Sequence, residues 1–180
     1  MPSERSLYRK IQIAIDIAKS VRVDSMQGLA AEIEARELPS FNTLQYDRER
    51  DTFVPRQSGR TIRRVLHLCR RLDLLADDGH LSEHGRIILR RTKFDGILAN
   101  QVRNVLREHG VNLKRINTVI RSKLKADPPI LPTASELWES MQPELRQADF
   151  SRLLTLLVNC GTAESSQRRV FLRINGTEDS

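Results

Sequence analysis

Residues 58–91 have the sequence SGRTIRRVLHLCRRLDLLADDGHLSEHGRIILRR, which predicts a helix, a short turn and a second helix. In the first helix, apolar residues recur at intervals of three and four, the spacing of one buried helical face. These residues are Ile62, Val65, Leu66, Cys69 and Leu72. The opposite face is basic, and its side chains are Arg60, Arg63, Arg64, His67, Arg70 and Arg71. A helix that buries one side and presents guanidinium groups on the other is suited to reading a DNA groove.

Capping signals mark the ends of the two helices in this stretch. Ser58 is the predicted N-cap of a helix that ends near Leu74, and Ser82 is the predicted N-cap of a helix that ends near Arg91. Between the helices, Asp78-Gly79 stands between short apolar flanks, which predicts a tight β-hairpin.

The residues before this stretch predict two more helices and a long connection. The helices cover 5–20 and about 25–38, with Asp24 as the expected N-cap of the second and Pro39 as its end. The connection, 40–57, has the sequence SFNTLQYDRERDTFVPRQ, in which charges alternate too evenly to build a core. We expect a long, mobile loop in which FNTLQY is a candidate edge strand.

The alternating charges of this loop allow two further interpretations. Arg48 and Arg50 could contact phosphate, but Asp47, Glu49 and Asp51 offset their charge, which favours a solvated loop. The same three acids could bind Mg²⁺ in a nuclease. The interleaved arginines disfavour that interpretation.

The order of these elements resembles a winged helix-turn-helix domain. The resemblance rests on TIRRVLHLCRRLDLL and DDGHLSEHGRIIL and covers about residues 5–92. Members often have a recognition helix ending in LGLL, a short wing containing Gly, and a helix start of the form LTxxGR. Leu72–Leu75, Asp77–His80 and Leu81–Arg86 correspond to these here. The resemblance implies that 58–74 is the recognition helix, although the 40–57 segment before it departs from the family's pattern.

The second half of the chain predicts further helices and a strand pair. Asn112 is a candidate N-cap of a helix over 113–125. The exposed basic side chains of this helix are Lys114, Arg115, Arg121, Lys123 and Lys125. ADPPILP then predicts a stiff linker, and Thr133 with Glu136 forms a capping box. A helix over 147–159 and a hairpin in GTAESSQRRVFLRI follow, so residues 97–175 resemble a second winged helix.

Positive charge is concentrated in the middle of the chain. The 180 residues carry a net charge of +7, but 56–126 contains 17 Lys or Arg against six acids. A basic segment of this kind predicts a polyanionic partner. No apolar run approaches the roughly 20 residues needed to cross a bilayer, and the first residues contain no apolar signal segment. We therefore expect a cytoplasmic protein with no membrane partner.

Signs of catalysis and of cofactor binding are sparse. The sequence has no glycine-rich phosphate loop, nucleotide fingerprint or serine nucleophile elbow. His67, Cys69, His80 and His84 could suggest a metal site, but His67 and Cys69 lie about 200° apart on a helix. Cys69 and Cys160 fit buried thiols in a reducing compartment. We expect no catalytic residue, metal or cofactor.

Together these features predict a mainly α protein of two winged-helix-like units, each a small helical bundle with a short β-hairpin, over 1–95 and 96–180. We expect a non-catalytic protein that binds double-stranded DNA, with a regulatory role or an accessory role in a larger DNA-processing or phage-defence complex. Arg60, Arg63 and Arg64 are best placed for base edges or phosphates, and the 113–125 helix for the backbone. Aromatic residues make up only 4% of the chain, which argues against single-strand binding by stacking.

The alternative is a protein-interaction scaffold. Tandem winged helices also serve as scaffolds in larger assemblies, including chromosome-organising and phage-defence complexes, so the resemblance implies this role as well. The 147–159 helix has a nearly neutral exposed face, and we expect any protein partner to bind through residues 130–175.

Overall fold

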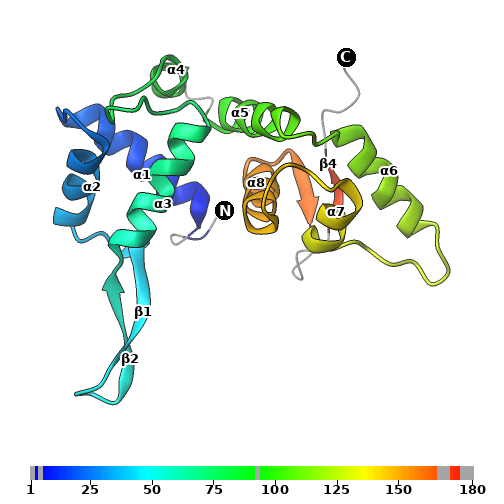
Figure 1. Cartoon of the computed structure of the whole chain (residues 1–180), viewed down its shortest axis with the longest axis horizontal. Helices are drawn as coiled ribbons and strands as arrows, with labels where there is room; N and C mark the ends of the chain where they lie inside the picture. The colour runs from blue at the N-terminus through cyan, green and yellow to red at the C-terminus, as the bar shows by residue number, and fades with distance from the viewer. Residues whose placement is uncertain (1–2, 4–5, 92–93, 166–170, 175–180) are drawn as a thin grey trace. The chain divides into compact units, whose positions relative to one another are not determined.

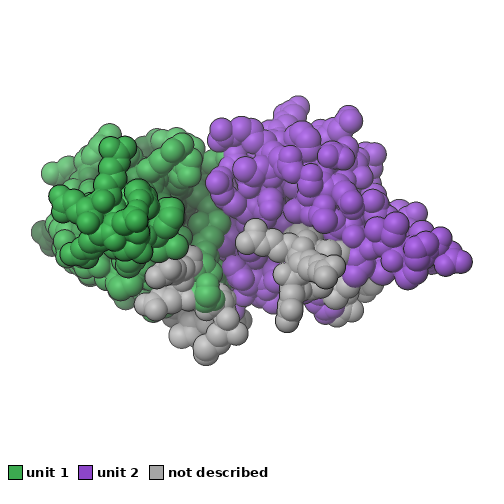
Figure 2. Space-filling view, turned by 90° about the horizontal axis from the view of Figure 1, so that it is seen from below, with its two compact units in different colours: residues 1–92 green, residues 93–180 purple. Residues whose placement is uncertain are grey.

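The chain divides into two compact units, residues 1–92 and residues 93–180 (Figure 2). The computed structural model describes residues 3, 6–91, 94–165 and 171–174. Helices dominate both units, and each unit also contains a two-stranded antiparallel hairpin. The mainly α class predicted from the sequence is therefore confirmed.

Unit 1 (residues 1–92) is built on three helices that pack against one another, α1 (Leu7–Ser20), α2 (Met26–Ala35) and α3 (Gly59–Arg71) (Figure 1). Its core consists of apolar side chains at helical spacing, which are fully buried. They include Ile11, Ile15, Leu29, Ile33, Ile62 and Leu66. Burial of these side chains, at roughly 1.5–3 kcal/mol each, holds the three helices together.

The predicted boundaries of α2 are wrong at both ends. Ser25, not Asp24, is the N-cap, because its hydroxyl accepts a hydrogen bond of 3.0 Å from the backbone N–H of Gly28. The helix ends at Ala35, and Glu37 then adopts a left-handed φ of 47°. Pro39 begins a separate 3₁₀ turn, η1 (Pro39–Phe41), in which its missing N–H costs nothing.

The segment between α2 and α3, expected to be a long connection with a candidate edge strand in FNTLQY, contains that strand and a second one paired with it. Strands β1 (Asn42–Asp47) and β2 (Thr52–Gln57) pair antiparallel from Asn42↔Gln57 to Asp47↔Thr52. The hairpin projects away from the helices of unit 1 (Figure 1). Alternation along a strand places Leu44, Tyr46, Phe53 and Pro55 on one face of it.

The turn after α3 is tighter than predicted. The helix ends at Arg71 instead of Leu74, because Asp73 turns the chain with a φ of 53°. The expected Asp78-Gly79 hairpin is reduced to a single bridge between Leu75 and Leu81. α4 (Glu83–Arg91) follows, and Ser82 caps it by accepting a hydrogen bond of 3.1 Å from the N–H of Gly85.

Unit 2 (residues 93–180) contains α5 (Phe94–Glu108), α6 (Leu113–Leu124), α7 (Ala134–Met141) and α8 (Gln147–Asn159). Strands β3 (Ala163–Ser165) and β4 (Phe171–Ile174) pair antiparallel after α8. Helix α8 is central, since it packs against α5, α7 and β3. Its buried residues are Phe150, Leu153, Leu154, Leu156 and Leu157.

Most local signals in unit 2 are confirmed. Asn112 caps α6, and Thr133 and Glu136 form a complete capping box at the start of α7. The α8 bounds agree with the predicted 147–159. The hairpin predicted in GTAESSQRRVFLRI is present as β3 and β4, and the residues between these strands, 166–170, lie outside the described residues. Across the described ranges, the structure has no helix with the length and apolarity that a bilayer crossing needs.

Candidate nucleic-acid interface

Helix α3 presents the predicted basic face to solvent. Ile62, Val65, Leu66 and Cys69 are buried on its inner side. Arg60, Arg63, Arg64, His67 and Arg70 are exposed, and Arg71 is half-buried. At 3.6 residues per turn the six basic residues lie within an arc of about 120°. The structure therefore brings all six onto one side of the helix.

Most of the charge at the start of α3 is not neutralised by ion pairs. Arg60, Arg63 and Arg64 form no ion pair with any residue that the structure describes. Near the end of the helix, Arg70 Nη1 lies 3.4 Å from Asp77 Oδ1, a pair that is largely exposed and therefore weak.

One carboxylate of α2 lies close to this basic face. A β-carbon added to Gly59 would lie 3.7 Å from both Glu34 Oε1 and Arg63 Nη1. Of the three N-terminal arginines, Arg63 therefore lies on the side of α3 that faces an acid of α2. Arg60 and Arg64 lie further round the helix, at about 60° and 100° from Arg63. Arg60 and Arg64 are therefore the two more accessible of these three arginines.

The basic residues of α6 do not all share one side. Lys114, Arg121 and the C-cap residue Lys125 fall within roughly 40° of one another around the helix and are exposed. Arg115 is also exposed, to the side of this stripe. Lys123 points towards α7, where its Nζ lies 3.3 Å from Glu136 Oε2. Lys123 thus supports the capping box of α7 and is not part of this exposed stripe.

Of the four residues considered for a metal site, His80 and His84 contact carboxylates and Cys69 is buried. His84 Nδ1 lies 2.7 Å from Asp73 Oδ2, and His80 Nδ1 lies 3.1 Å from Asp78 Oδ2. The hydrogen bond that the backbone N–H of His80 donates to Asp78 is the main reason that the pKa of Asp78 is lowered. Burial raises the pKa of Cys69 to about 12. Among the residues described, His, Cys, Asp and Glu form no group of three or more that could hold a metal ion.

The acids of the hairpin turn stabilise the turn itself. Asp47 accepts hydrogen bonds from the backbone N–H groups of Glu49 and Arg50, and it lies 3.0 Å from Arg56 Nη2. Asp51 accepts a hydrogen bond from the Tyr46 hydroxyl, which raises the pKa of Tyr46. These contacts give the alternating acids a local structural role.

Two surface features were not predicted from the sequence. The first is the apolar face of the hairpin, where Leu44, Tyr46 and Phe53 are 63%, 51% and 63% exposed. Alternation of apolar residues on either side of the DRERD turn was a signal for it. The second is a hollow lined by residues of 18–24 and 80–86. No local pattern indicates such a site, because its walls come from distant segments.

Comparisons with protein-family models, with curated proteins and with solved structures give no match for this chain. We therefore infer function from the geometry and charge of the molecule itself.

Proposed function

We propose that this chain is a non-catalytic protein that binds double-stranded DNA through the basic face of α3. The observation that carries the proposal is the row of exposed arginines at the start of this helix, which form no ion pairs with other described residues. A polyanion would supply the negative charge with which these arginines form no ion pair among the described residues.

The dimensions of the helix suit the major groove. Arg60 and Arg71 are separated by about 16 Å along the helix axis, at 1.5 Å per residue. The groove is about 12 Å wide and admits one α-helix. Arginine binds the O6 and N7 edge of guanine with two hydrogen bonds, and it also binds phosphate. Arg60 and Arg64 are the preferred base-edge or phosphate contacts, because Arg63 faces Glu34.

The stripe on α6 would add affinity without sequence recognition. Lys114, Arg121 and Lys125, with Arg115 beside them, would contact the phosphate backbone and release counterions. Each such contact makes the slope of log K against log[salt] steeper by about 0.9. Unit 2 would therefore contribute mainly through this salt-dependent term.

The order of elements supports a tandem winged-helix arrangement. In unit 1, α3 follows two helices and precedes a small bridged turn, as a recognition helix precedes a wing. In unit 2, α7, α8, β3 and β4 have the order of two helices followed by a wing hairpin. A regulatory or accessory role in a DNA-processing or defence complex is consistent with this arrangement.

Titration of a labelled 20-base-pair duplex at 50 and 200 mM salt, followed by fluorescence anisotropy, tests the proposal. If five phosphates are contacted, affinity should fall by about 500-fold between these conditions, since the slope is about −0.9 per contact. A single strand of the same length should bind more weakly, because the basic faces lack stacking aromatics. Absence of duplex binding at 50 mM salt would refute the proposal.

A second candidate function is protein interaction through the hairpin. Its apolar face is exposed on an isolated two-stranded sheet, and such sheets are marginally stable unless something packs against them. A photo-crosslinking amino acid placed at Tyr46 in cells should yield protein adducts. The matched control is Gln45, which is also exposed but lies on the opposite face. Equal adducts at both positions, or none, would argue against this role.

A further inference from the structure

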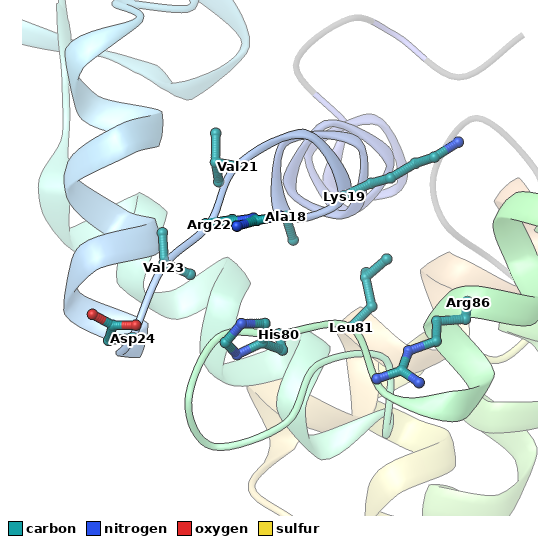
Figure 3. A pocket seen from close by; sticks show the side chains of 9 residues that line it. All are labelled: Ala18, Lys19, Val21, Arg22, Val23, Asp24, His80, Leu81 and Arg86. Atoms are coloured by element: carbon teal, nitrogen blue, oxygen red, sulfur yellow. The ribbon is translucent and has the colours of Figure 1, made fainter.

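A hollow in the surface of unit 1 brings together basic side chains from three separate segments (Figure 3). Lys19 comes from the last turn of α1, Arg22 from the turn before α2, and His80 and Arg86 from the turn and helix after α3. The volume of the hollow is about 420 Å³. This lies within the range of about 300–1,000 Å³ that is typical of small-molecule sites.

The charge of the hollow is positive and largely uncompensated. Lys19, Arg22 and Arg86 form no ion pair with another residue in the part of the chain that the structure describes. His80 pairs with Asp78, and Asp24 is the one carboxylate in the lining. In Figure 3 the end of α1 and the 21–24 turn lie on one side, with His80 and Arg86 across from them.

The walls of the hollow are held in place by close backbone packing. Gly79 has a φ of 84°, and a β-carbon there would lie 3.0 Å from the carbonyl oxygen of Ser25. The turn that carries His80 therefore packs closely against the turn that carries Arg22. A β-carbon at Gly85 would lie 2.3 Å from the carbonyl oxygen of Leu74, which fixes the start of α4 and with it Arg86. Close backbone contacts thus hold the segments from which His80 and Arg86 project.

We propose that this hollow, with Arg22 and Arg86 as its principal donors and Lys19 and His80 beside them, binds a phosphate group. Guanidinium groups match the oxygens of phosphate with paired hydrogen bonds. The remaining lining is apolar, namely Ala18, Val21, Val23 and Leu81. Asp24 disfavours negative charge at its own edge of the hollow, so we expect the phosphate oxygens on the side of Arg22 and Arg86.

The phosphate could belong to a free phosphorylated small molecule or to the backbone of a bound duplex. Only the duplex source depends on the proposed DNA-binding function. The two sources require separate probes, which are inorganic pyrophosphate without DNA and a 20-base-pair duplex without pyrophosphate.

The key variant is the double substitution Arg22→Gln and Arg86→Gln in the full chain. Its matched control is Arg36→Gln with Arg107→Gln, which removes the same charge from exposed positions outside the hollow. Circular dichroism and the midpoint of urea unfolding should be unchanged in both proteins. If the double variant fails to fold, Arg22→Gln and Arg86→Gln alone should each weaken binding several-fold.

Calorimetric titration with pyrophosphate should show one site in the unmodified chain and in the control. At least tenfold weaker binding in the double variant would identify a free phosphorylated ligand. If pyrophosphate does not bind, the duplex titration decides. A slope of log K against log[salt] that is smaller by about 2 in the double variant, but unchanged in its control, would assign the site to backbone phosphate. If neither probe distinguishes the double variant from its control, the proposal is overturned.

Discussion

Tyr46 and Phe53 lie directly opposite each other on β1 and β2, with ring centroids 5.4 Å apart and planes inclined at 62°. This edge-to-face arrangement is favourable for aromatic rings, and cross-strand pairs are the main source of stability in a hairpin. Because the pair is half or more exposed, it stabilises the hairpin without joining it to the helical core. The hairpin should therefore open independently of the helices.

Replacement of Phe53 by Ser should loosen the hairpin selectively. Removal of the aromatic contact should speed hydrogen exchange of the amides in 42–57, while the amides of α1 and α3 keep their protection. Exchange measured by NMR tests this prediction. The control is Gln45→Ser, which changes the opposite face and should leave exchange nearly unaltered. Equal acceleration in the helices would show that the hairpin and the core open together.

Replacement of Arg60, Arg63 and Arg64 by Ala should weaken duplex binding without unfolding the chain. Each lost phosphate contact should reduce the salt slope by about 0.9, and each lost base contact should cost about 1–3 kcal/mol of discrimination. Anisotropy titrations at several salt concentrations measure both effects. A variant lacking Arg9, Arg36 and Arg107 removes the same charge elsewhere and should bind more tightly than the α3 variant. Comparable losses in both would indicate that only net charge matters.

Replacement of Gly85 by Ala should destabilise unit 1. The added β-carbon would lie 2.3 Å from the carbonyl oxygen of Leu74, so α4 must move away from that backbone. We expect a loss of about 1–3 kcal/mol. The control is Gly96→Ala in α5, where nothing lies within 4 Å and the substitution should stabilise the helix by up to about 1 kcal/mol. Thermal unfolding followed by circular dichroism compares the two, and similar midpoints would contradict the packing argument.

The stability of unit 1 should fall as the pH rises above about 9. Burial raises the pKa of Cys69 from 9.0 to about 12, so the folded state keeps its proton while the unfolded state releases it. Stability from this thiol is complete below pH 9 and is lost at about 1.4 kcal/mol per pH unit up to pH 12. Urea unfolding at pH 8, 9.5 and 10.5 measures the slope. Cys69→Ala should have a shallower slope, and an unchanged slope would show that other groups cause the loss.

Local signals in the sequence predicted most helices and several of their caps, but not the two ends of α2 or the C-terminal end of α3. Apolar spacing located the buried face of α3, and Ser58, Ser82 and Asn112 act as the predicted caps. Asp24 and Ser25 are both good capping residues, and only the backbone geometry selects Ser25. The left-handed residues Glu37 and Asp73 end α2 and α3 early, and non-glycine residues give little warning of this conformation.

Tertiary placement explains the remaining differences. The FNTLQY stretch was expected as an edge strand and is present as β1, but the charges of the DRERD turn concealed its partner β2, because the side chains that pair in the hairpin flank the turn rather than form a continuous apolar run. Lys123 follows a basic pattern in sequence but meets Glu136 of α7, a partner that helical spacing cannot reveal. The basic hollow of unit 1 is likewise invisible in sequence, since Arg22 and Arg86 are distant along the chain.

A backbone hydrogen bond joins the two ends of the hairpin at its base. The backbone N–H of Ser58 donates to the carbonyl oxygen of Phe41 at 3.4 Å, and Phe41 is fully buried beneath it. The two ends of the 42–57 segment therefore meet where the helical core is already complete. This segment is an exchangeable module: a two-residue connection could replace it, or a foreign hairpin could be grafted there, without re-threading the three helices. Unit 1 can thus carry a different surface in place of the 42–57 hairpin while the packing of α3 against α1 and α2 stays the same.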